Sequence, residues 1–136
     1  MGAWSHEPFG NDTAGDWAYG LEEATDTSLL EEAFDTVLAS GDEYLESPEA
    51  EEAIAAAEVV AKMLGKGTQI DAYTEKIDEW VSQMATQPTI ELRRKAAASL
   101  RRILAPNSEL PELWAESDEA EEWTSSMQRL IGAVEA

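Results

Sequence analysis

The spacing of apolar residues repeats with the period of an α-helix in almost every segment of the chain. A first short helix is expected over residues 12–24, capped by Asn11 or Asp12, and a second over residues 27–40. No segment shows the alternation that is typical of a convincing strand. The pattern therefore predicts an all-α protein.

The third helix, expected over residues 47–65, is predicted to lie at the centre of the fold. It opens with Ser-Pro-Glu, a strong start signal because a hydroxyl can cap the helix, proline suits the first position and an acid suits the first turn. On a helical wheel its narrow polar strip consists of Glu51, Glu58 and Lys62. Because a helix that is apolar on most sides is buried, we expect its neighbours to surround it.

Further helices are expected over residues 70–85, 88–105 and from about residue 117 onward, with a short segment over 109–114. The helix over 70–85 has a narrow apolar seam for one neighbour, made of Ile70, Tyr73, Ile77, Trp80 and Met84. We predict one compact domain, residues 1–136, in which about six to seven helices form a bundle. Residues 1–10 are expected as an extended aromatic segment packed on that bundle.

The helix over 88–105 carries a basic stripe beside its apolar face. The stripe consists of Arg94, Lys95, Arg101 and Arg102. Such a stripe can bind nucleic acid or an anionic ligand. We expect it instead to contact the acidic half of the chain, within one molecule or across a dimer, or to face solvent. Arg93 lies on the apolar side and is expected to pair with a carboxylate or to snorkel.

The chain is strongly acidic, with 29 acids, nine bases and a net charge of −20. Residues 1–61 hold 16 of the acids and neither Lys nor Arg. The negative electrostatic field of such a chain repels nucleic acid and anionic membranes and attracts basic proteins. Solubility, or adaptation to high salt or an acid-rich proteome, is the simpler explanation of the charge. With no membrane-spanning run and no signal-peptide pattern, the expected location is the cytoplasm.

Motifs for catalysis and metal binding are missing from the sequence. There is no cysteine, which excludes disulfides and thiol chemistry. The single histidine, His6, is a weak candidate for a catalytic triad, and it also excludes N-myristoylation, which needs Ser or Thr at that position. Neither di-iron, calcium-loop nor phosphate-loop motifs are present. We expect no cofactor and no metal, and we favour a non-enzymatic protein over an enzyme.

The remaining candidate residues gather near the aromatic N-terminal segment. They are Trp4, His6, Phe9, Trp17 and Glu58. One hypothesis is that they line a pocket for a small ligand or a reaction. In the other, Trp4 and Phe9 dock into the bundle as a plug, while Glu58 pairs with Lys62 four residues further on. The plug hypothesis predicts that Trp4→Ala costs about 3 kcal/mol or more.

The opening MGAWSHEPFGND resembles the start of a bacterial family, domain of unknown function 4259, whose members begin M-G-x-W-G-x-G-P-F-x-N-D. Further matching stretches are YLE at 44–46, PEA at 48–50, AAAE at 55–58, NSEL at 107–110 and LW at 113–114. Ser5 and Glu7 stand where the family has glycines, so the loop must differ or be strained if those glycines need positive φ angles. The resemblance implies a small, free-standing helical domain and brings no known activity.

The leading hypothesis for function is a non-enzymatic, acidic interaction module. It would bind a basic protein, as an immunity or antitoxin protein does. The alternatives are a small-ligand or enzymatic domain with a pocket near the aromatic segment, and a structural homo-oligomer. The sequence leaves open whether the protein is a monomer or a homodimer.

Overall fold

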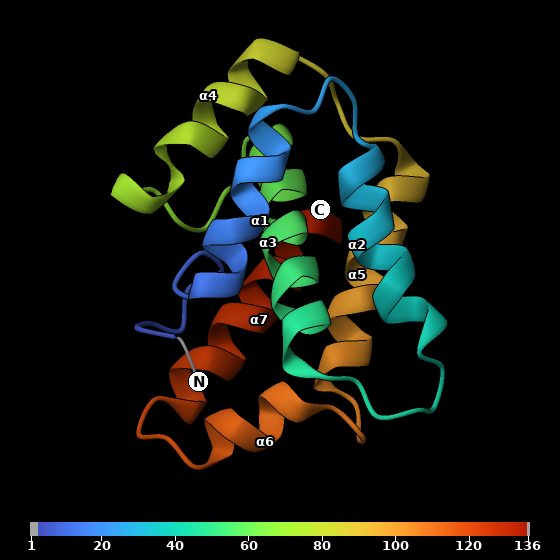
Figure 1. The fold of residues 1–136 in the computed structure, drawn as a ribbon, viewed down its shortest axis with the longest axis vertical. Helices are drawn as coiled ribbons and strands as arrows, with labels where there is room; N and C mark the ends of the chain where they lie inside the picture. The colour runs from blue at the N-terminus through green and yellow to red at the C-terminus, as the bar shows by residue number, and fades with distance from the viewer. Residues whose placement is uncertain (1–2, 136) are drawn as a thin grey trace.

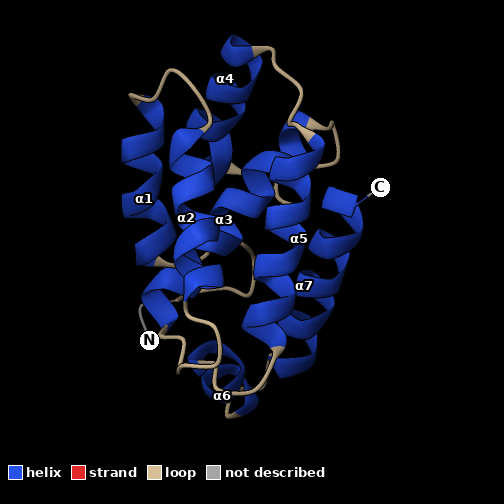
Figure 2. Cartoon of the chain, turned by 90° about the vertical axis from the view of Figure 1, so that its right-hand side faces the viewer, coloured by secondary structure: helices blue, strands red, loops and turns tan. Residues whose placement is uncertain are grey.

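The computed structural model describes residues 3–135, which form seven α-helices, one short 3-10 helix and no strand (Figure 2). The elements are α1 Asp12–Glu22, α2 Ser28–Ala39, α3 Ser47–Met63, η1 Ala72–Thr74, α4 Glu75–Met84, α5 Ile90–Leu104, α6 Glu109–Ala115 and α7 Ala120–Glu135. The prediction of an all-α bundle of six to seven helices is confirmed. None of the helices within residues 3–135 is long and apolar enough to cross a membrane.

The helix α3 lies at the centre of the bundle, as predicted (Figure 1). It contacts α1, α2, α4, α5, α6 and α7. Residues 53–61 are buried throughout. Because many of these side chains are alanines, neighbouring helices can approach closely on several sides.

Two predicted helix ends are confirmed by their hydrogen bonds. The Asn11 side-chain oxygen Oδ1 accepts from the Ala14 N–H at 2.8 Å and caps α1. At the end of α3, Gly65 adopts a φ of 75° and the Lys66 N–H donates to the Ala61 carbonyl at 2.8 Å. This left-handed glycine reverses the chain into the loop that follows.

The fourth predicted helix differs from its expected form. Asp71 accepts a hydrogen bond from the Tyr73 N–H at 2.9 Å and starts η1, so that α4 begins only at Glu75. Ile70 and Tyr73 are therefore 83% and 60% exposed, and the first part of the predicted apolar seam is wrong. Trp80 is buried as predicted, and its indole Nε1–H donates to the Ala24 carbonyl at 3.0 Å.

The helices α1, α3 and α7 run in the same direction, and α6 crosses the end of the bundle near which they begin (Figure 1). This arrangement brings three longer helix N-termini toward one end of the molecule. Acidic side chains follow in the first turn of each: Asp12 in α1, Glu49 in α3, and Glu121 and Glu122 in α7. Negative charge is stabilised there by the helix dipoles.

Candidate functional site

Residues 4–10 form a loop that precedes α1 in the chain and folds back on itself. The N–H groups of Trp4 and Ser5 both donate to the Gly10 carbonyl, at 2.9 and 3.3 Å. A Cβ on Gly10 would lie 2.9 Å from the Ser5 carbonyl oxygen, so the loop leaves no room for a side chain there. The Ser5 hydroxyl accepts from the Glu7 N–H at 3.2 Å. Neither Ser5 nor Glu7 has a positive φ, so the loop accepts both residues without strain.

The two aromatic residues of this loop have different environments. Phe9 is 2% exposed and belongs to the hydrophobic core, as the plug hypothesis predicts. Trp4 is 48% exposed and lies against Tyr73 of η1, with ring centroids 5.3 Å apart. The prediction that Trp4 docks into the bundle is therefore wrong. The reversal at Gly10 directs Phe9 inward and leaves Trp4 on the surface.

Gln69 joins the N-terminal loop to the loop after α3. Its side-chain oxygen accepts from the Phe9 N–H at 2.8 Å, and its side-chain amide donates to Asp71 at 3.0 Å. Its own backbone N–H donates to Glu58 at 2.8 Å. Gln69 is 2% exposed, so one buried amide connects the aromatic loop, η1 and the central helix.

Glu58 is fully buried on α3 and its carboxylate is held by the chain itself. It accepts three hydrogen bonds: from the Thr68 N–H at 2.8 Å, from the Thr68 hydroxyl at 2.6 Å and from the Gln69 N–H at 2.8 Å. Burial raises the pKa of Glu58, while these hydrogen bonds and the Lys62 charge act in the opposite direction. This carboxylate therefore anchors a loop.

Lys62 pairs with Glu58 as the spacing predicts, but at a long distance of 3.9 Å. Its ammonium Nζ donates more closely to the Gln69 carbonyl at 2.6 Å and to Asp78 of α4 at 2.7 Å. The Lys62 side chain is 5% exposed. Sequence reasoning found this pair and missed Gln69 and Asp78, because only the fold brings the loop and α4 to α3.

The other pocket candidates lie apart from this network. His6 is partly exposed and its Nδ1 is 3.2 Å from a carboxylate oxygen of Glu119, the residue that precedes α7. Trp17 is buried on the core side of α1. The structure thus places Phe9, Trp17 and Glu58 in the interior and leaves Trp4 and His6 at the surface. No cluster of three or more potential metal ligands occurs within the described part of the chain.

The basic stripe of α5 is divided between different neighbours. Lys95 pairs with Asp35 of α2 at 3.0 Å, which raises the pKa of Lys95 through the hydrogen bond. Arg102 donates to backbone carbonyls of two loops. One is the loop between α2 and α3, with the carbonyls of Gly41 at 2.9 Å and Glu43 at 2.6 Å, and the other is the loop that follows α5. Lys95 and Arg102 therefore contact the acidic half of the same chain, which is one of the arrangements expected from the sequence.

Arg94 and Arg101 are exposed on another side of α5, toward α7. Arg101 pairs with Glu135 near the end of α7. Arg93 does not simply snorkel, since its Nε donates to the Val134 carbonyl at 3.0 Å. The guanidinium groups of Arg93, Arg94 and Arg101 therefore lie near the C-terminal end of α7.

A cluster of carboxylates, here called the acidic end, surrounds the N-terminus of α3. Its members are Asp12, Glu46, Glu49, Glu51, Glu52, Glu109 and Glu112. The loops before α3 and α6 are held together by two backbone hydrogen bonds, from Leu45 N–H to Asn107 at 2.8 Å and from Glu109 N–H to Leu45 at 2.9 Å. The Ser47 N–H also donates to the Glu109 carboxylate at 2.7 Å.

Like charges meet at the acidic end. Partial burial raises the pKa of Glu51 against a hydrogen bond from Thr13, and the charges of Glu109 and Asp12 raise it to a smaller extent. Burial and the charge of Glu49 likewise raise the pKa of Glu52. None of the ion pairs formed among residues 3–135 involves a carboxylate of the acidic end. No ion pair of the described residues therefore offsets this repulsion, although the Arg102 guanidinium lies against the neighbouring carbonyls of Glu43 and Asn107.

Tyr44 presents a half-exposed aromatic ring beside these carboxylates. Its hydroxyl donates to Glu112 at 3.0 Å. Desolvation, this hydrogen bond and the charges of Glu112 and Glu109 raise the pKa of Tyr44. The acidic end therefore combines negative charge with an exposed aromatic surface, a combination that suits lysine and arginine side chains.

The raised carboxyl pKa values give an expected pH dependence of stability. A carboxyl whose pKa is higher in the folded protein takes up a proton on folding, so stability decreases as pH rises from its ordinary value of 4.5 through the folded value. The urea midpoint should therefore be higher near about pH 5 than near about pH 8. The lowered pKa of Asp26 and the raised pKa of Lys95 act outside this interval.

Glu51→Gln combined with Glu52→Gln should reduce this pH dependence, because the two amides do not titrate and only the raised pKa of Glu58 remains. Urea unfolding followed by circular dichroism at several pH values measures both proteins. A urea midpoint that rises from weakly acidic to weakly basic pH would contradict the conclusion that Glu51 and Glu52 have raised pKa values in the folded protein.

The fold and the charge distribution define a small, acidic, all-helical domain in which the hydrogen bonds of the buried residues Glu58 and Gln69 join the first loop to the central helix. Residues 2–126 match the family described as Domain of unknown function (DUF4259), and the chain belongs to that family. No curated protein and no solved structure matches it.

Proposed function

We propose that the protein is a non-enzymatic interaction module that binds a basic protein through the acidic end. The observation that carries the proposal is the concentration of like charge around the start of α3, where partial burial, with smaller contributions from the charges of Glu109 and Asp12, raises the pKa of Glu51. A partner that supplies lysine or arginine side chains there would relieve the repulsion. Such a partner would also be steered toward this surface by long-range attraction.

Acidity that serves only solubility or salt tolerance needs no particular placement on the surface. The acidic end differs from that expectation in two respects. Two of its carboxylates, Glu51 and Glu52, are partly desolvated, which costs free energy in the absence of a counter-charge. It also includes the exposed ring of Tyr44, which can stack on a guanidinium group.

The buried carboxylate network favours an interaction function over an enzymatic one. The carboxylate of Glu58 accepts three hydrogen bonds from within the chain, and Lys62 is held by Gln69 and Asp78. The polar groups of Glu58 and Lys62 thus hold the folded chain together through these hydrogen bonds. The candidate residues at the surface, Trp4 and His6, contact Tyr73 and Glu119 and do not converge on Glu58.

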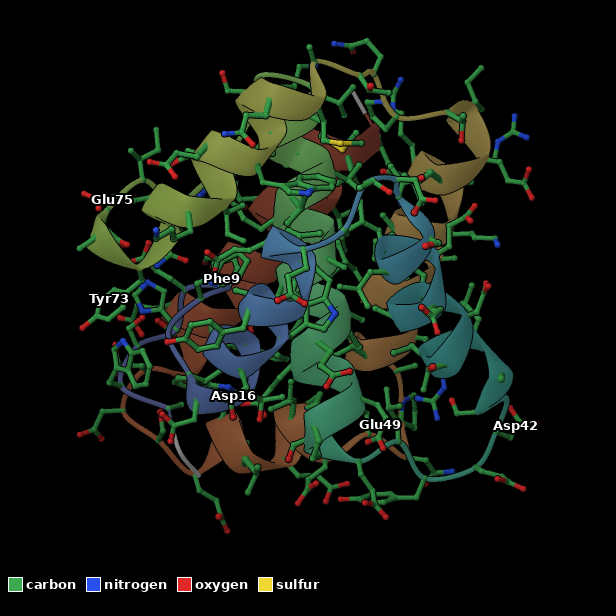
Figure 3. All side chains as sticks on the ribbon, turned by 45° about the horizontal axis from the view of Figure 1, so that its top comes forward. Phe9, Asp16, Asp42, Glu49, Tyr73 and Glu75 are labelled. Carbon is green, nitrogen blue, oxygen red and sulfur yellow. The ribbon has the colours of Figure 1, made fainter. Side chains whose placement is uncertain are left out.

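The test compares capture of basic proteins from a native lysate by three forms of the protein. In the first variant three exposed acids of the acidic end are neutralised, as Asp12→Asn, Glu46→Gln and Glu112→Gln. The control carries the same charge change on exposed acids of α1 and α4, as Glu22→Gln, Glu75→Gln and Glu79→Gln. Figure 3 shows Glu75 and Glu49 on well-separated parts of the molecule.

The wild type and the control should retain the same basic protein at moderate ionic strength, and the acidic-end variant should lose it. Because three charges contribute, the affinity loss should be about tenfold or more, and it should shrink as salt is added. Equal retention by the two variants would mean that only net charge matters. Retention of no basic protein by the wild type, at low or moderate salt, would reject the proposal.

A further inference from the structure

A groove of about 350 Å³ lies between α5 and the end of α7, apart from the acidic end. Its apolar lining is formed by Ile90, Ala97, Ala98 and Val134. Ile90 is 65% exposed, so an apolar surface is open to solvent there. The volume falls at the lower end of the range of small-molecule sites, about 300–1,000 Å³.

The polar lining of this groove is dominated by arginine. Arg93, Arg94 and Arg101 line it, although the chain holds only nine bases against 29 acids. Arg94 is exposed, and no ion pair joins it to a carboxylate within residues 3–135. The groove is thus a local positive site on a strongly negative molecule.

One of these arginines already binds a carboxylate of the chain itself. The carboxylate of Glu135 lies against the Arg101 guanidinium at the rim of the groove. Both side chains are about half exposed, so this pair is weak and can be exchanged for an external carboxylate at little cost. An arginine fork binds a carboxylate through two parallel hydrogen bonds.

We propose that the groove between α5 and the end of α7 binds a small amphipathic carboxylate. Arg94 and Arg101 bind the carboxylate, and the apolar body of the ligand covers Ile90, Ala97 and Val134. Glu135 competes with the ligand for Arg101. The proposal is independent of the acidic end, because none of these residues belongs to it.

Octanoate is the probe, since it carries one carboxylate on a short apolar chain. Its binding to the full chain is followed by backbone amide NMR shifts, with circular dichroism confirming that each variant is folded. Octanol supplies the apolar body without the charge, and inorganic phosphate supplies charge without the apolar body. Octanoate should give saturable shifts at residues 90–101 and 134–135, and the other two probes should bind at least about tenfold more weakly.

Two pairs of variants separate the groove from a general electrostatic effect. Arg94→Gln should weaken octanoate about tenfold, whereas Arg129→Gln, an exposed arginine of α7 outside the groove lining, should not. Glu135→Gln should tighten octanoate by up to about fivefold, because it removes the competing carboxylate. Glu122→Gln, near the other end of α7, changes the net charge equally and should have little effect.

The proposal is overturned if octanoate gives no saturable shifts in the groove, or if octanol or phosphate binds as well as octanoate. It is also overturned if Arg94→Gln and Arg129→Gln act alike, since attraction to the whole molecule would then explain binding. A tenfold difference between these two arginine variants, together with tighter binding by Glu135→Gln, supports the site.

Discussion

Glu58→Ala is expected to lower the free energy of unfolding by about 3 to 5 kcal/mol. The carboxylate is fully buried, and its removal leaves the N–H groups of Thr68 and Gln69 without their acceptor. It also removes one of the two carboxylates near the buried Lys62 ammonium. The loss should be measured by urea unfolding with tryptophan fluorescence.

Two further substitutions on α3 make this result specific. Glu52→Ala removes a partly exposed carboxylate of the same helix whose pKa is raised by burial and by Glu49, so it should change stability by about 1 kcal/mol or less. Glu58→Gln keeps the side-chain volume and one acceptor oxygen, and should fall between the wild type and Glu58→Ala. If Glu58→Ala costs no more than Glu52→Ala, the carboxylate does not anchor the loop.

Phe9→Ala is expected to cost about 3 to 5 kcal/mol, as truncation of a buried aromatic side chain does. The Phe9 ring is 2% exposed, while its backbone hydrogen bond to Gln69 survives the substitution. The loss therefore reports packing of the ring. Thermal or urea unfolding measures it directly.

Trp4→Ala is the matched comparison from the same loop. Trp4 is 48% exposed and has one aromatic neighbour, so its truncation should cost only about 1 kcal/mol. This value replaces the larger loss expected from the sequence. Equal losses for Trp4→Ala and Phe9→Ala would contradict the arrangement in which only Phe9 fills the core.

The helices could be predicted because their signals are local. Asn11 caps α1, and Gly65 ends α3, as their positions in the sequence indicate. The almost complete lack of a polar face on α3 was enough to place that helix at the centre of the bundle. The two helix ends depend on interactions within about one helical turn, and the position of α3 follows from a pattern along a single helix.

The predictions failed where local signals competed. Asp71 bonds the backbone two residues on and delays α4, which leaves Ile70 outside the helix despite its spacing. Trp4 and Phe9 looked equivalent in the sequence because both are large and aromatic. The chain reversal at Gly10 distinguishes them, and it depends on backbone hydrogen bonds that no residue pattern states.

The sites depend on contacts between residues far apart in the chain. Gln69 is the residue that joins Phe9 to Glu58, and nothing in its sequence context marks it as buried. The acidic half of the chain was evident from composition, but its concentration near Glu51 required α6 to return beside the start of α3. The basic stripe was predicted as one surface, and the fold divides it between α2, two loops and the groove near Glu135.

The measurement that tests the proposed function most directly is amide hydrogen exchange of the protein with and without the basic protein that it captures. Binding at the acidic end should slow exchange at residues 42–52 and 109–115, which carry most of the acidic end, and leave exchange at residues 75–84 of α4 unchanged. Protection confined to α4 or to the groove of α5, with the acidic end unchanged, would contradict it.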